Sequence, residues 1–357
     1  MNLEFDDSIR MHPGVRRQER DKIRRCFIRL VDSKLDLHRN GPLNRLSIKC
    51  KDDVGPAPVI RWISKVLNRH VTELVLNISS HWSWPLSSEV DSSVTMCQEF
   101  WESCSVSSIT LMRLTFRFKQ MYSDAIADTY PNVNFPLLVE ASLDLRMTHE
   151  QIGQAKLSDD DIAKEKEGTM VGNATVLLMG ICNVKKLYLS DNTLEVLAFC
   201  CKPMPVYNNL VHLTIKTHPN VEWESLTALL KNCQNLETLV FEGLLHRYGM
   251  NCGSGECLCK PWEEEEVPTC LSSSPVKILE IMKFGDICED EDMDKMMEQV
   301  EYFLETMPNL EQLIIHFETD IDEDVLEVLS QFQMVSREGL SKCKIQVISD
   351  NLNLSST

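Results

Sequence analysis

Apolar residues in this chain alternate between two spacings, that of a helix and that of a strand. Residues 225–243 hold one copy of each. Three leucines fall there on one face at helical spacing, which predicts a short amphipathic helix over 225–232. Leu236, Leu239 and Phe241 follow at strand spacing, so that alternate side chains point to one side. A helix and a strand this short cannot bury their apolar faces alone, so the unit must stack on copies of itself.

The strand pattern recurs along the chain. Leu187, Leu213 and Leu239 occupy the same place in successive strands at intervals of 26 residues, a period typical of leucine-rich repeats. Other intervals run from 28 to 40 residues, which indicates insertions. We therefore predict an α/β fold, an irregular leucine-rich-repeat solenoid with a curved, mostly parallel sheet inside and helices outside. The predicted strands begin at Leu43, Val71, Ile109, Val139, Val184, Leu210, Leu236, Val276 and Leu310, with a candidate last strand at Lys344.

The composition is that of a folded intracellular protein. Hydrophobic residues make up 43% of the 357, and no apolar run approaches the roughly 20 residues that span a bilayer. The N-terminus is charged where a secretory signal would be apolar, so we expect a cytoplasmic or nuclear location and no membrane partner. The 14 cysteines are then expected to be reduced. A net charge of -18 argues against a nucleic-acid partner.

Residues 10–29 form one basic stretch within this acidic chain. It has two interpretations. One is a patch for nuclear import or for an acidic partner. The other is the solvated face of a first helix, with Ile23, Phe27, Leu30 and Val31 as its buried stripe. We favour the second, because charged faces of amphipathic helices usually contact only water.

The chain lacks the sequence motifs of common catalytic sites. It contains no phosphate-binding loop G-x-x-x-x-G-K-[ST], no nucleophile elbow G-x-S-x-G and no zinc helix H-E-x-x-H. We therefore expect no enzymatic activity and no cofactor.

A cysteine-rich stretch is the one candidate metal site. Cys252, Cys257 and Cys259 are spaced C-x4-C-x-C, with His246 before them and Cys270 after them. Together they offer three or four soft ligands to zinc. The spacing is not that of a standard zinc knuckle, so a flexible reduced loop is the favoured interpretation and His246 is expected to be a loop or surface residue. A zinc-supported enzyme around these residues is the alternative.

In a repeat of this kind, the residues between the inward leucines lie on the exposed face of the sheet. That face combines aromatic, charged and apolar side chains, which suits a protein or peptide partner better than a phosphate or a sugar. Ile278, Met282 and Ile314 are the favoured anchors, since exposing them without a partner is unfavourable. The candidate partner-binding residues are Tyr188, His212, Lys216, Ile278, Glu280, Met282, Ile314 and His316.

Several long sequence segments resemble those of a known family. CLSSSPVKILEIMKFGD, VEYFLETMPNLEQLIIHF and SKCKIQVIS occur in this order within residues 268–349, and LLMGICNVKKLYLSDNTLEVL and NNLVHLTIK precede them. They resemble the FBD domain and the repeat region of plant F-box/FBD/leucine-rich-repeat proteins. Such proteins usually begin with an F-box rich in leucine and proline. Residues 1–40 do not resemble one, because they contain one proline and no tryptophan.

The resemblance implies the substrate-recognition part of an SCF-type (Skp–cullin–F-box) E3 ubiquitin ligase receptor, acting in protein ubiquitination. It implies a Skp-type adaptor and a cullin as partners only if a divergent F-box exists. The alternative is an F-box-less interaction or decoy protein that is not coupled to a ligase. The predicted parts are a basic helical lead-in over 1–40, a repeat region over 41–267 with insertions near 81–93, 157–168 and 250–267, an FBD-like domain over 268–349, and a tail over 350–357.

Overall fold

The structure is a computed structural model that forms two compact units. Unit 1 comprises residues 1–184 and 199–203, and unit 2 comprises residues 185–198 and 204–357. The structure describes residues 1–8, 15–38, 41–50, 54, 56–80, 113–120, 126, 130, 132, 134–160, 172–249, 252, 257–259, 269–285, 290–318, 322–335, 343–350 and 352–355.

Unit 1 is a parallel sheet with helices packed against it. Its strands pair in sequence order, each parallel to the next. Leu46, Leu74 and Leu114 are in register on adjacent strands and are at most 1% exposed, as the repeat pattern predicts. The elements are β1 (Asn2–Asp6), α1 (Arg17–Leu37), β2 (Arg45–Cys50), α2 (Pro56–Leu67), β3 (Glu73–Ser80), β4 (Arg113–Gln120), β5 (Glu140–Asp144), α4 (His149–Asp160) and α5 (Thr175–Met179).

The first strand was not predicted from the sequence. Residues 2–6 lie within the predicted helical lead-in, yet they form β1, which pairs in parallel with β2. Leu3 lies opposite Leu46, and Phe5 lies opposite Ile48. Two apolar residues at the start of a chain are too few for a strand pattern to be recognised. The lead-in is therefore a strand followed by a helix.

The helix α1 buries a narrower stripe than predicted. Phe27, Val31 and Leu35 are buried, and Phe27 packs edge-on against Trp62 of α2, with ring centroids 6.4 Å apart. Leu30 was predicted to lie in this stripe but is 47% exposed. The helix α2 buries Trp62, Ile63 and their apolar neighbours at helical spacing.

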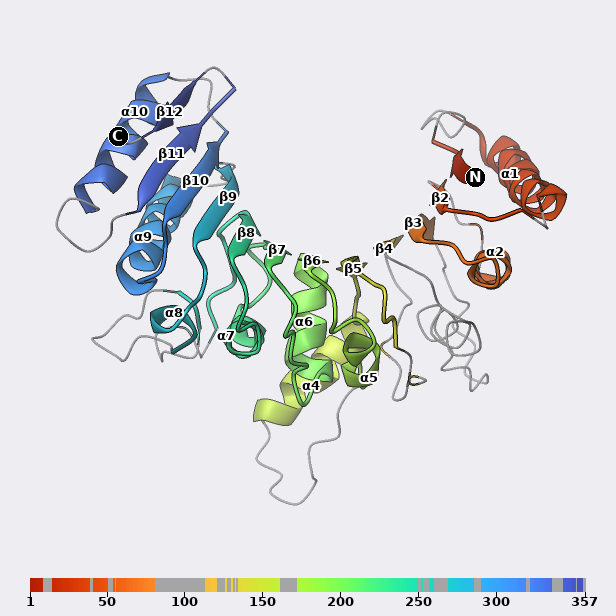
Figure 1. Cartoon of the computed structure of the whole chain (residues 1–357), viewed down its shortest axis with the longest axis horizontal. Helices are drawn as coiled ribbons and strands as arrows, with labels where there is room; N and C mark the ends of the chain where they lie inside the picture. The colour runs from red at the N-terminus through yellow and green to blue at the C-terminus, as the bar shows by residue number, and fades with distance from the viewer. Residues whose placement is uncertain are drawn as a thin grey trace. The chain divides into compact units, whose positions relative to one another are not determined.

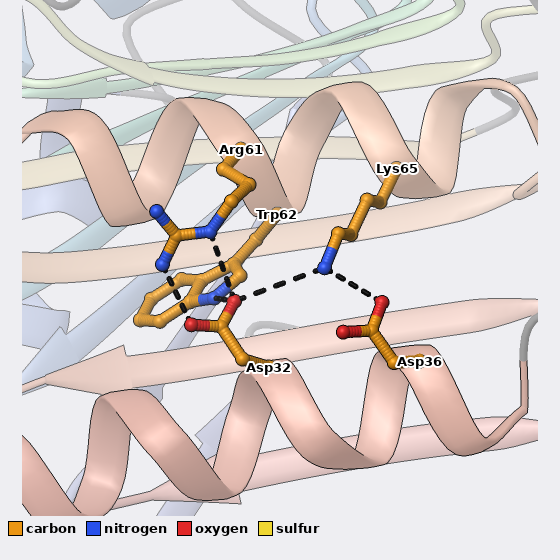
Figure 2. A network of polar contacts seen from close by, with 5 residues as sticks. All are labelled: Asp32, Asp36, Arg61, Trp62 and Lys65. Atoms are coloured by element: carbon orange, nitrogen blue, oxygen red, sulfur yellow. Dashed lines mark hydrogen bonds and ion pairs between the residues drawn. The ribbon is translucent and has the colours of Figure 1, made fainter.

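A polar network joins α1 to α2 above this apolar contact (Figure 2). Asp32 accepts two hydrogen bonds from Arg61, at 2.6 and 3.0 Å, and one from the indole Nε1 of Trp62 at 3.0 Å. Lys65 lies 2.7 Å from Asp36 and 3.9 Å from Asp32. The Trp62 side chain is fully buried, and its indole N–H is its only polar group. The hydrogen bond to Asp32 gives that N–H an acceptor.

Unit 2 continues the same architecture. Strands β6 to β11 run parallel in sequence order, and β12 closes the edge of β11 in the antiparallel direction. Figure 1 shows α7 and α8 together on one side of the neighbouring strands. The elements are β6 (Lys186–Leu189), α6 (Asp191–Cys200, shared with unit 1), β7 (His212–Lys216), α7 (Glu224–Lys231), β8 (Thr238–Glu242), α8 (Thr269–Ser272), β9 (Ile278–Phe284), α9 (Asp290–Thr306), β10 (Gln312–Phe317), α10 (Asp322–Val335), β11 (Lys344–Ile348) and β12 (Asn353–Ser355).

The alternation of side chains along these strands confirms the predicted repeat. Leu187, Leu213, Leu239, Leu279 and Leu313 are in register and at most 1% exposed. The residues between them are mostly half-buried on the opposite face. The chain is therefore an α/β protein of the leucine-rich-repeat type, as its sequence predicts.

Other predictions concern segments that the structure describes in part. The insertion near 81–93 lies outside the described residues. The insertion near 157–168 begins inside α4, and the rest of it is not described. The predicted tail contains β12, a strand that the sequence pattern did not predict. No helix in the described part of the chain has both the length and the apolar character that crossing a membrane requires.

Candidate functional site

The first candidate site is the strand face of unit 2, defined as the outward side chains of β6 to β10. The strand register places Tyr188, Thr214, Val240, Glu280 and Ile314 in one row across five strands. Because parallel strands in register stack equivalent residues, the alternation seen in sequence becomes a continuous surface. All eight candidate partner-binding residues lie on this face, and all are half-buried.

Polar residues of the strand face are paired with one another or, for Lys216, with the first residue of α6. His316 Nε2 lies 2.8 Å from the Glu280 carboxylate on the adjacent strand. Tyr188 Oη donates to Glu242 at 3.3 Å, reaching across β7. Lys216 Nζ lies 3.5 Å from Asp191. These contacts restrict the rotamers of the polar side chains.

Apolar side chains lie between these polar pairs. Ile278 aligns with Thr238 on one side and with Gln312 on the other, and Ile314 aligns with Glu280. Met282 aligns with Glu242. The strand face therefore combines apolar side chains with charged and amide groups.

The second candidate site is the Cys3His cluster, defined as His246, Cys252, Cys257 and Cys259. One ligand atom from each residue lies within 4.8 Å of the others. His246 Nε2 is 3.4 Å from the Cys252 sulfur and 3.7 Å from the Cys257 sulfur. The three cysteines are 2–7% exposed, and His246 is 9% exposed. His246 therefore lies in a loop, one of the two placements expected from the sequence, but it is buried and not at the surface.

Aromatic and backbone groups orient the Cys3His cluster. The His246 ring stacks on Trp223, with centroids 4.3 Å apart and planes 18° apart, and it also contacts Tyr248 at 4.9 Å. The Gly249 amide donates to the Cys252 sulfur at 3.3 Å. The amide of Gln299, from α9, donates to the Leu258 carbonyl at 3.0 Å between two of the cysteines. Both the ring and the loop backbone are therefore held in place.

The electrostatic environment favours ionisation within the cluster. Hydrogen bonds from Cys257 and Cys259, and then from His246, lower the pKa of Cys252. Hydrogen bonds with Cys252 and Cys259, and then burial, raise the pKa of Cys257.

The fourth predicted sulfur ligand, Cys270, does not join the cluster. It lies on α8, where it is buried near Lys231 and Thr227 of α7, and its burial raises its pKa. The fourth donor atom of the cluster therefore comes from His246 and not from Cys270. Sequence spacing could not make this choice, because the folding of α7 and α8 determines which side chains meet.

The basic stretch forms the exposed face of α1. Arg16, Lys22, Arg25 and Arg29 are exposed, opposite the buried stripe. Asp21 pairs with Arg24 at 2.9 Å within the same helix. The import or partner-binding interpretation of this face stays an untested alternative to the favoured solvated face.

Comparisons with known proteins agree with the fold. No protein-family model matches the chain, and no solved structure matches it. The chain is similar to F-box/LRR-repeat protein At3g59210 of Arabidopsis thaliana, with 42% identity over 432 aligned positions that cover 100% of this chain and 88% of that protein. It is also similar to putative F-box protein At1g58310 of the same plant, with 40% identity over 99% of this chain and 89% of that protein.

A third relative carries the FBD designation in its name. Putative F-box/FBD/LRR-repeat protein At3g59240 of Arabidopsis thaliana is 39% identical over 98% of this chain and 82% of its own length. The fold defines the class, a leucine-rich-repeat protein. At this identity and coverage, the chain belongs to the plant F-box/LRR-repeat family.

Proposed function

We propose that this chain is a protein-recognition module that holds the substrate of an SCF-type ubiquitin ligase on the strand face of unit 2. It acts by binding rather than by catalysis. Family membership supports the ligase context, and the row from Tyr188 to Ile314 supports the binding surface. The proposal implies a location in the cytoplasm or nucleus, where such ligases meet their substrates.

The proposal rests mainly on one observation: polar side chains that already hydrogen-bond to each other lie next to half-buried apolar side chains on the strand face. The Glu280–His316 contact of 2.8 Å lies beside Ile314. A partner that covers this patch would desolvate this hydrogen-bonded pair and bury an isoleucine together. Residues in such mixed, central patches carry most of the binding energy of an interface.

The strand face can be tested with a photo-crosslinking amino acid in place of Met282 in the full chain expressed in plant cells. We expect a defined protein to be crosslinked and its abundance to fall when the chain is overproduced. Ile314→Asp should weaken that crosslink at least about tenfold, the cost of one interface anchor. Leu326→Asp is the matched control, because Leu326 is an apolar residue on α10 and is 54% exposed. Equal crosslinking by both variants would disprove the assignment of the strand face.

Coupling to a ligase needs a separate test. The chain is used to capture a Skp-type adaptor and a cullin, and a second form carries an F-box grafted from a relative. Capture by the native chain supports the ligase role. Capture by the grafted form alone favours the alternative, an interaction or decoy protein that binds the same partners without recruiting a ligase.

A further inference from the structure

The Cys3His cluster has the donor set of a structural metal site. Three cysteine sulfurs and one imidazole nitrogen are a common ligand set for structural zinc. We propose that His246, Cys252, Cys257 and Cys259 bind one zinc ion in a closed tetrahedral site. This inference goes beyond the recognition function and is independent of the strand face.

The interatomic distances fit a tetrahedral ion. Zinc–sulfur bonds of about 2.3 Å and zinc–nitrogen bonds of about 2.0–2.1 Å place a sulfur and a nitrogen ligand about 3.5–3.6 Å apart and two sulfur ligands about 3.8 Å apart in a tetrahedron. The distances from His246 Nε2 to the Cys252 and Cys257 sulfurs, 3.4 and 3.7 Å, are close to the sulfur–nitrogen separation. All four donor atoms lie within 4.8 Å of one another, so a small contraction completes the tetrahedron.

A network of thiol hydrogen bonds is the simpler explanation of the same contacts. It explains them less well. A neutral imidazole offers one lone pair, yet the sulfurs of both Cys252 and Cys257 point at His246 Nε2. Sulfur is also a weak acceptor, so three buried thiols gain little from one another. A zinc ion satisfies every donor at once and balances the thiolate charges.

The surroundings resemble the outer shell of a metal site. The Gly249 N–H bond to the Cys252 sulfur is the kind of contact that stabilises a metal-bound thiolate. Stacking on Trp223 fixes the plane of the His246 ring. Among the residues that the structure describes, the buried Tyr302 hydroxyl has no hydrogen-bond partner, and Tyr302 lies on α9, the helix whose Gln299 binds the loop. Outer groups of this kind orient ligands before the ion arrives.

The site explains how an irregular segment is buried. Residues 243–249, 252 and 257–259 contain no helix or strand, yet Leu244 and Leu258 are at most 3% exposed. A zinc ion would crosslink this segment and hold it against Trp223 and α9. Four protein ligands leave no open position for substrate or water, so the role is structural and the zinc-supported enzyme is not favoured.

The first experiment measures metal in the purified full chain. We expect about one zinc per chain by elemental analysis after dialysis, the stoichiometry of a single closed site. X-ray absorption at the zinc edge should show three sulfur neighbours and one nitrogen neighbour. Exchange of zinc for cobalt should give the intense visible bands of tetrahedral cobalt–thiolate coordination.

Matched variants assign the ligands. Cys257→Ser and His246→Ala should reduce the zinc content to near zero. Cys270→Ser is the control, because Cys270 is a buried thiol close in sequence but outside the cluster, and it should retain zinc. Since a ligand variant can fail to fold, the wild-type chain is also stripped with a chelator. Adding zinc back should raise its thermal midpoint, whereas adding magnesium should not.

Three results would overturn the proposal. The first is a folded wild-type chain with reduced thiols and no bound zinc. The second is zinc that persists unchanged in both ligand variants. The third is a bound metal other than zinc, or a disulfide among the three cysteines found by mass spectrometry. None of these results would affect the test of the strand face.

Discussion

The indole Nε1 of the fully buried Trp62 donates a hydrogen bond to Asp32 on the neighbouring helix, at 3.0 Å. Asp32→Ala leaves this N–H without an acceptor, so we expect a loss of about 1–3 kcal/mol in the free energy of unfolding. Urea unfolding followed by tryptophan fluorescence measures it.

Two further substitutions separate this hydrogen bond from the ion pairs around it. Asp32→Asn keeps an acceptor oxygen for Trp62 and should cost less than Asp32→Ala. Asp36→Ala removes a contact with Lys65 from a side chain that is 50% exposed, and it should cost about 1 kcal/mol or less. Equal losses from Asp32→Ala and Asp36→Ala would contradict the role of the tryptophan bond.

Gly285 follows β9 with a φ of +85°, and a Cβ built there would lie 2.3 Å from the Phe317 ring. Gly285→Ala therefore combines a left-handed backbone with a clash in the core. We expect a loss of about 2–4 kcal/mol, seen as a lower thermal midpoint. Gly153→Ala is the control, since that glycine lies in α4 and an added methyl group would meet no atom within 4 Å. It should stabilise the chain by about 0.5–1 kcal/mol, and a similar loss from both would refute the steric explanation.

Asparagines before the strands link successive repeats. Asn235 Nδ2 donates to the Asn208 carbonyl, and Asn309 Nδ2 donates to the Ser274 carbonyl, both at 2.7 Å. Each Asn→Ala change should cost about 0.5–1.5 kcal/mol, and the double variant should show nearly the sum. Gln234→Ala, at an exposed position beside Asn235, is the control and should change stability by less than about 0.5 kcal/mol. No difference between Asn235→Ala and this control would argue against the link.

Cys233 is fully buried and donates to the Leu229 carbonyl at 3.1 Å, and burial raises its pKa to about 12. Alkylation requires the thiolate. At pH 8, Cys233 should therefore react at least about a hundredfold more slowly than the exposed Cys26, as peptide mass spectrometry can measure. Equal rates in the folded chain would contradict this burial.

The same thiol makes stability depend on pH. Its pKa rises from the ordinary cysteine value of 9.0 to about 12 in the folded chain, because burial disfavours the thiolate. Below pH 9 the thiol is protonated in both the folded and the unfolded chain, so the free energy of unfolding is unaffected. Between about pH 9 and 12 only the unfolded chain loses this proton, so the free energy of unfolding falls as the pH rises. Cys233→Ala should reduce that loss, measured as thermal midpoint against pH.

Local patterns predicted the repeating parts well. The helix predicted over 225–232, observed as Glu224–Lys231, and the strands around Leu213, Leu239 and Leu313 repeat a short apolar spacing often enough to be recognised without their neighbours. The strand β1 was missed because its pattern is short. Leu30 was misplaced because the width of a buried stripe depends on which neighbour packs against the helix, here Trp62.

The class of fold, the inward leucines and the strand-face residues could be derived from the sequence, because each follows from a period of about two or 3.6 residues. Which thiols meet depends on the tertiary structure. Cys270 lies close in sequence to Cys259 but packs against α7, whereas His246, Trp223 and Gln299 converge on the cluster from separate elements. Such convergence depends on contacts between residues distant in sequence, which a local pattern does not encode.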